Sequence, residues 1–125
     1  MTPTKAAQEL DLVPETVVHE NGEGKAIEIS AEGPRVFVVA MEVLQIIDQE
    51  FLHLSIWGSA DGAQWGPMPL VKFPQVFYPG SSQMVVDLAA RPEVRFLQAR
   101  WEVNRWGRGK PVPMFRFRVT ARPVA

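Results

Sequence analysis

The chain has 125 residues, of which 46% are hydrophobic and 22% are charged, and these values predict a single globular domain with one core. The absence of cysteine excludes disulfides, zinc–thiolate sites and thiol nucleophiles. No signal-peptide pattern precedes the first predicted strand and no apolar run is long enough to span a bilayer, so the default expectation is a cytoplasmic protein without a membrane partner.

The net charge of −1 hides an uneven distribution along the sequence. Residues 1–90 contain four basic and twelve acidic residues, whereas residues 91–125 contain nine basic and two acidic ones. One interpretation is an antiparallel sheet in which basic C-terminal strands lie beside acidic N-terminal strands. The alternatives are an anion-binding face and head-to-tail self-association between opposite charges.

In chain order, residues 1–15 lack a periodic pattern and are predicted to form a flexible arm, with the domain itself over 16–125. Residues 16–20 and 25–30 are predicted strands, joined as a hairpin by the turn-forming segment between them. Residues 35–47 are apolar on both faces, which favours a central strand over the competing helix because β-branched residues are dense there.

The stretch from Leu52 to Pro67 is predicted to be a strand that ends in a tight turn. Residues 59–62, Ser-Ala-Asp-Gly, supply turn-forming side chains and a glycine that can adopt positive φ. Trp57 and Trp65 flank the turn, and Trp65 is expected to fold back over it and cover one end of the core. Short strands are predicted over 70–73 and 83–88, between proline-containing segments.

The clearest alternation lies near the C-terminus. Residues 94–105 place Trp101 on an apolar face and Arg100 on a polar face, and residues 113–122 alternate in the same way. With the glycine-rich loop 106–111 between them, they predict a hairpin that has one core face and one arginine-lined face. About eight short strands and no convincing helix predict an all-β, antiparallel β-sandwich of jelly-roll type.

Residues 59–65, Ser-Ala-Asp-Gly-Ala-Gln-Trp, resemble the S-x-D-G-x-x-W turn of discoidin-like (coagulation factor 5/8 type C) modules. Residues 94–100 are similar to a later strand of those modules and residues 115–119 to their closing strand, so the resemblance covers residues 50–122. It implies a galactose-binding-like jelly roll. It implies no binding residue here, because the ligand-binding loops vary within that family, and the family's cysteine staple has no counterpart in this chain.

Patterns typical of enzymes and metal sites are sparse. His19 and His53 lie far apart in sequence, and no G-x-S-x-G or phosphate-binding loop pattern is present. Asp48 and Glu50 carry the oxygen ligands that calcium prefers, but their spacing matches no calcium loop, so solvated turn acids are the better interpretation. The sequence therefore predicts no enzyme activity, no cofactor and no metal.

Three kinds of ligand remain. Nucleic acid is disfavoured, because Trp101 is predicted to be buried and the isoelectric point is near 6.1. Carbohydrate could stack on Trp57, Trp65, Trp106 or Tyr78 at strand ends and loops. Another copy of the chain or another protein could bind through the apolar run 36–47 and the opposite charges, as in a phage-like structural component.

The sequence thus predicts a non-enzymatic binding or interaction module that self-assembles through acidic and basic faces, with a carbohydrate-binding module as the alternative. The candidate interaction residues are tryptophans and arginines of the second half of the chain: Trp57, Trp65, Trp106, Arg100, Arg105, Arg108, Arg116 and Arg118.

Overall fold

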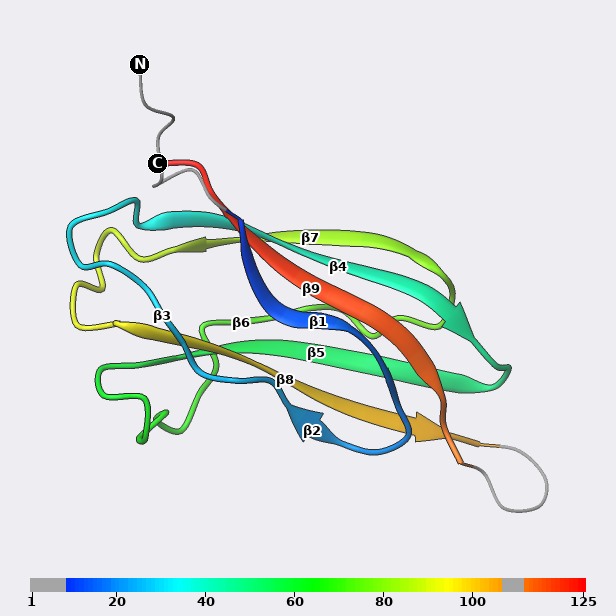
Figure 1. Cartoon of the computed structure of the whole chain (residues 1–125). Helices are drawn as coiled ribbons and strands as arrows, with labels where there is room; N and C mark the ends of the chain where they lie inside the picture. The colour runs from blue at the N-terminus through cyan, green and yellow to red at the C-terminus, as the bar shows by residue number, and fades with distance from the viewer. Residues whose placement is uncertain (1–8, 107–111) are drawn as a thin grey trace.

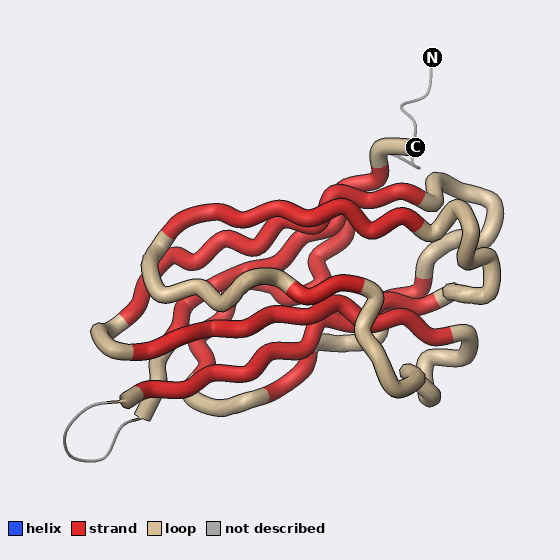
Figure 2. The backbone as a smooth tube through the Cα atoms, turned by 180° about the vertical axis from the view of Figure 1, so that it is seen from behind, coloured by secondary structure: helices blue, strands red, loops and turns tan. Residues whose placement is uncertain are grey.

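The computed structural model describes residues 9–106 and 112–125, which form a β-sandwich of two antiparallel sheets (Figures 1 and 2). One sheet has the order β1 (Leu10–Val18), β9 (Phe115–Pro123), β4 (Val36–Ile46) and β7 (Gly80–Asp87). The other has the order β2 (Gly22–Glu23), β8 (Phe96–Arg105), β5 (Glu50–Ser59) and β6 (Val71–Lys72), and β3 (Ile27–Glu28) also pairs with β8. Within these residues no helix is long and apolar enough to cross a membrane.

The pairing of the strands is nested. β5 pairs with β6, β4 with β7, β2 and β3 with β8, and β1 with β9. In sequence, the β5–β6 pair is enclosed by β4–β7, then by the pairs of β2 and β3 with β8, and finally by β1–β9. From the innermost pair outward, successive pairs belong alternately to the two sheets. This arrangement is the jelly roll, in which two Greek keys are wrapped into one sandwich. The predicted fold class is confirmed.

The core lies between the two sheets and is built by alternate residues of each long strand. β9 contributes Phe115 and Phe117, both fully buried, and Phe117 packs edge-on against Trp101 of β8 with ring centroids 5.5 Å apart. Trp101 also donates its indole N–H to the carbonyl of Glu20 at 3.1 Å, so its one polar atom is satisfied. Each such aromatic contributes roughly 2–3 kcal/mol by leaving water.

The apolar run near residue 40 is a strand and not a helix, as the β-branched residues predict. β4 pairs with β9 on one side and with β7 on the other, so it is central in its sheet. Its inward side chains, among them Val39 and Met41, are completely buried, while Val38 and Ala40 on the outer face are only partly covered.

The two hairpins expected from local sequence are wrong. β8 and β9 follow one another in sequence but belong to opposite sheets, with β8 beside β5 and β9 beside β1 and β4. Likewise, residues 16–18 pair with β9, whereas β2 and β3 pair with β8. β1 also begins at Leu10, and Leu12 and Val13 are buried, so residues 10–15 belong to the sandwich and not to an arm.

Candidate binding site

The outer face of the sheet formed by β2, β8, β5 and β6 carries the densest group of aromatic and polar side chains. Strand alternation turns Leu54 and Ile56 of β5 into the core, so their neighbours Ser55 and Trp57 face outward. Across the ladder, Ser55 pairs with Arg100, and this row continues to Glu23 of β2. Side chains from three strands therefore converge on one point of the surface.

Arg100 is the centre of this group. Its guanidinium carbon lies 4.3 Å from the centroid of the Trp57 ring and 5.8 Å from that of the Trp65 ring. Its Nε donates to the side-chain oxygen of Gln98 at 3.0 Å and lies 3.6 Å from a carboxylate oxygen of Glu23. The electron-rich faces of both indole rings attract the cation, which favours this direction of the guanidinium.

Gln98 and Ser55 accept hydrogen bonds from the Arg100 and Trp57 side chains, respectively. Gln98 is buried although it lies on the outer side of β8, and its amide nitrogen donates to the carbonyl of Gly24 at 3.0 Å. The indole N–H of Trp57 donates to the Ser55 hydroxyl at 2.9 Å. The orientations of the arginine and of Trp57 are thus set by hydrogen bonds before any ligand arrives.

A surface groove of about 550 Å³ runs beside the arginine. Its walls come from the segment around β2 and from the outward faces of β5 and β8. The lining residues are Asn21, Gly22, Glu23, Ser55, Trp57, Arg100, Trp101 and Glu102. Arg100 lies 3.6 Å from a carboxylate oxygen of Glu23, and Glu102 also lines the groove, so the groove is not a basic surface.

Trp65 is positioned by the predicted tight turn after β5. Asp61 Oδ1 accepts the backbone N–H groups of Ala63 and Gln64, both at 2.9 Å, and the Ser59 hydroxyl accepts that of Gly62 at 2.9 Å. These bonds favour the charged carboxylate: the Gln64 and Ala63 amides lower the pKa of Asp61 most, and the Ser59 hydroxyl lowers it further.

Gly62 adopts φ +79°, as the turn sequence predicts. Trp65 does not cover the end of the core, contrary to the prediction. It is half-buried outside the core and lies beside Arg100. A second hollow of about 470 Å³ borders its other side, between the turn and the segment that contains Arg91.

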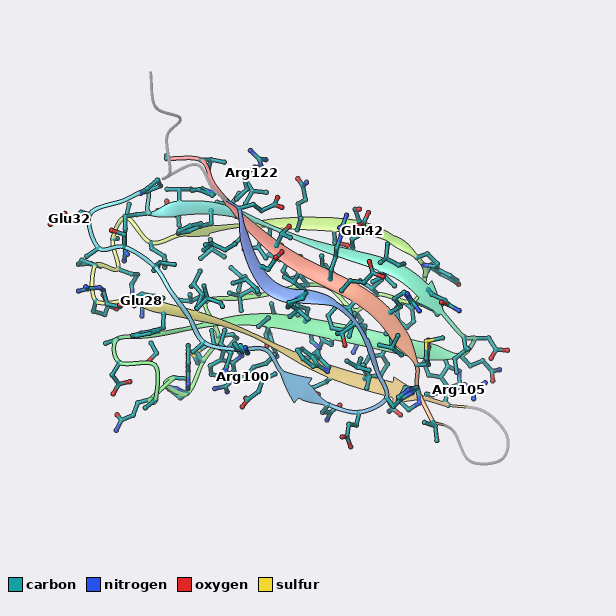
Figure 3. All side chains as sticks on the ribbon, in the orientation of Figure 1. Glu28, Glu32, Glu42, Arg100, Arg105 and Arg122 are labelled. Atoms are coloured by element: carbon teal, nitrogen blue, oxygen red, sulfur yellow. The ribbon has the colours of Figure 1, made fainter. Side chains whose placement is uncertain are left out.

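The remaining arginine candidates do not join this site. Arg116 and Arg118 extend from the outer face of the opposite sheet, where they contact Glu15 of β1 at 3.2 Å and Glu42 of β4 at 2.6 Å. Figure 3 shows this separation, with Glu42 and Arg122 on one side of the sandwich and Arg100 on the other. Basic residues of β8 and β9 therefore form ion pairs with acidic residues of neighbouring strands in their own sheets, as the first interpretation of the uneven charge expected.

The other candidates lie near the end of β8. Arg105 bonds the carbonyl and carboxylate of Asp48, at 3.1 and 2.9 Å, and Trp106 packs edge-on against Phe77 with centroids 6.2 Å apart. Arg108 lies outside the described residues. Of the eight predicted interaction residues, the structure brings together Trp57, Trp65 and Arg100.

The residues considered for catalysis and metal binding are dispersed. The His19 ring lies 3.1 Å from the Pro113 carbonyl, and His53 faces outward opposite Glu102 but does not line the groove. Glu50 is not a solvated turn acid, because it is buried and accepts the backbone N–H groups of Ile47 and Met114. Among residues 9–106 and 112–125, no cluster of three or more metal-ligating side chains occurs.

Gln98 and Glu23 are among the contributors to the site that sequence reasoning missed. Gln98 shares the polar face of its strand with Arg100, so alternation alone could have identified it. Glu23 had been placed in a hairpin loop, and only its pairing with Arg100 across the β2–β8 ladder brings it here.

Comparison of the chain with models of known protein families finds no match, and comparison with curated protein sequences finds none.

Proposed function

We propose that this protein is a non-enzymatic binding module, and that its ligand lies on the outer face of the β2–β8–β5–β6 sheet. The observation that carries the proposal is the Arg100 guanidinium over the Trp57 ring and near the Trp65 ring, beside a groove of about 550 Å³. Rigid aromatic and arginine side chains on a supported surface are the residue types that dominate recognition sites. Gln98 and Ser55 supply that support by accepting hydrogen bonds from Arg100 and Trp57, respectively.

The chemistry of the groove favours a neutral saccharide as the ligand. Indole faces can stack on the apolar face of a sugar ring, and the Asn21, Ser55 and Arg100 side chains offer hydrogen-bonding groups for its hydroxyls. The carboxylates of Glu23 and Glu102, which line the groove, oppose a polyanion, so the same surface is poorly suited to nucleic acid. The resemblance of residues 59–65 to discoidin-like modules points to the same fold type and gives no ligand residue.

Assembly through opposite charges has less support. Two of the three arginines of β9 that would form a basic face, Arg116 and Arg118, pair with Glu15 and Glu42 of their own sheet. Because these charges are already paired within one molecule, they offer little net charge to a second copy. Salt also screens the remaining attraction between exposed charges.

Tryptophan fluorescence titrated with a panel of mono- and oligosaccharides tests the proposal. We expect a saturable change with at least one saccharide, which Arg100→Ala and Trp65→Ala reduce roughly tenfold or more in affinity. Trp106→Phe is the matched control, because Trp106 packs against Phe77 away from the groove. Saturable binding that is unaffected by Arg100→Ala would place the ligand elsewhere, and no response to any saccharide, checked by calorimetry, would sink the saccharide proposal.

A further inference from the structure

The two sheets expose four edges, and β7 differs from the other three. β1 contains Pro14 and two register shifts, near Asp11 and near Val13, which break the regularity of its outer side. β2, β3 and β6 are only two residues long. Proline, bulges and short strands are the features that prevent an edge from pairing with another chain.

β7 has none of these features. Gly80–Asp87 is eight residues long, pairs with β4 without a register shift, and contains neither proline nor a charged residue before Asp87. It is the last strand of its sheet, beyond β4 (Figure 1). Val85 on this strand is 56% exposed.

The hydrogen bonds around β4 show which backbone groups of β7 are free. Val36 bonds toward β9, donating its N–H to Ala125 and accepting from Val124, whereas Arg35 accepts the N–H of Leu88. Successive residues of an antiparallel strand direct their backbone N–H and C=O groups to opposite sides. In β7 the backbone groups of the even-numbered residues therefore point toward β4. The N–H and C=O groups of the odd-numbered residues therefore point outward from the sheet: Ser81, Gln83, Val85 and Asp87.

We propose that β7 pairs with β7 of a second copy of this chain, antiparallel, with Met84 of each copy on the two-fold axis. In this register Ser81 meets Asp87 of the partner subunit and Gln83 meets Val85 of the partner subunit. Every outward-pointing residue then exchanges both backbone hydrogen bonds with its counterpart. Registers centred on Gln83 or Val85 leave part of this set unmatched, because they place Asp87 opposite Pro79 or Ser81 opposite Ala89.

The side chains of β7 make a second copy a suitable occupant. The only charged residue, Asp87, meets a serine hydroxyl and not another carboxylate, so no like charges oppose each other across the interface. Val85 becomes covered by the aliphatic part of Gln83 from the partner subunit. The two-fold contact is closed, and it joins two four-stranded sheets into one continuous sheet.

The dimer edge is separate from the proposed ligand site. β7 belongs to the sheet of β1, β9 and β4, while Trp57 and Arg100 lie on the outer face of the other sheet. Each dimer thus keeps both ligand faces open. A failure of either proposal leaves the other standing, because one is measured by association and the other by ligand titration.

Sedimentation velocity of the full chain over a range of concentrations tests the pairing. We expect a dimer, and Val85→Lys should raise its dissociation constant roughly tenfold or more, because a lysine on the edge opposes strand addition. Val17→Lys is the matched control: Val17 is 41% exposed on β1, the opposite edge of the same sheet. Dimerisation should change little with salt, because no ion pair lies across the interface.

A monomer at every concentration would overturn the proposal, and so would equal effects of the two lysine variants. Association that weakens steeply with salt would favour contacts between charges instead, which also contradicts the β7 edge.

Cysteine cross-linking tests the register, since the parent chain contains no cysteine. The two Met84 positions form a non-hydrogen-bonded pair with Cα atoms about 4.5 Å apart, close enough for a disulfide. Met84→Cys should therefore oxidise to a covalent dimer on a non-reducing gel. Ser82→Cys is the control. Its side chain lies on the same face of β7 as that of Met84, but the two Ser82 Cα atoms of the dimer would be about 14 Å apart. Equal cross-linking of both variants, or none with Met84→Cys in a folded dimer, would contradict the register.

Discussion

The guanidinium carbon of Arg100 lies 4.3 Å from the centre of the Trp57 ring, and the two residues come from neighbouring strands of one sheet. The contact is diagonal across the ladder, because Arg100 is paired directly with Ser55 and Trp57 with Gln98. Long side chains can span such diagonal positions. The backbone register therefore creates the stacked pair, and the hydrogen bonds to Gln98 and Ser55 preserve it.

The Arg100–Trp57 contact predicts a measurable coupling. A double-mutant cycle with Arg100→Met and Trp57→Leu should give an interaction of about 0.5–1 kcal/mol, the range for a partly exposed cation–π pair. The free energy of unfolding in urea is the measurement. Additive effects of the two substitutions would show that the Trp57 ring and the Arg100 guanidinium are close but make no net stabilising interaction.

The lowered pKa of Asp61 predicts a pH-dependent turn. Its folded-state pKa lies below the unfolded value, so the charged carboxylate stabilises the fold above the ordinary aspartate pKa of about 3.9 and this effect is lost as the pH falls through the folded pKa. Asp61→Asn should therefore lower the urea midpoint at neutral pH, and the difference from the parent should shrink in acid. A difference that stays constant from neutral to acidic pH would contradict this explanation.

The buried carboxylate of Glu50 is expected to make a large contribution to the free energy of unfolding. Glu50→Ala removes the acceptor of two backbone N–H groups, those of Ile47 and Met114, and should cost about 3 kcal/mol of unfolding free energy. Asp48→Ala is the nearby control, because the exposed Asp48–Arg105 pair contributes at most about 1 kcal/mol. Similar losses in the two variants would show that the burial of Glu50 has no special consequence.

The ion pair between Arg118 and Glu42 predicts a small and salt-sensitive contribution. Both side chains are substantially exposed, at 52% and 36%, so Arg118→Gln should cost less than about 1 kcal/mol at low ionic strength. The loss should approach zero at high ionic strength, measured by chemical unfolding. The same variant should leave saccharide binding unchanged, because Arg118 and Arg100 lie on opposite faces of the sandwich.

Local patterns in the sequence predicted much of the fold. Alternation correctly placed Trp101 in the core and Arg100 outside it, because adjacent strand residues always face opposite sides. The turn at Ser59–Gly62 was also predictable, since its side chains bond their own backbone and Gly62 tolerates positive φ. Each of these features is determined within a few residues.

The partners of each strand were not predictable in this way. β8 and β9 alternate as two hairpin strands would, but the same alternation also suits two consecutive strands that face each other across a core. Phe117 and Trp101 take the second arrangement, meeting between the sheets. The position of Trp65 was missed for a related reason: the turn fixes where its chain returns, but the approach of the ring to Arg100 of another strand is not visible in the local sequence.

The nested strand order has a consequence for how the protein is made on the ribosome. β9 lies between β1 and β4, yet its residues are synthesised after those of every other strand. Until residues 115–123 emerge, the sheet has a gap at its centre, and the facing edges of β1 and β4 are unpaired. Folding is therefore expected to finish only after most of the domain has left the exit tunnel, and slowly, because the closing contacts join distant parts of the chain. During that interval the backbone groups of β4 that later pair with β9 are unpaired, and we expect chaperones that bind extended apolar segments to recognise this strand.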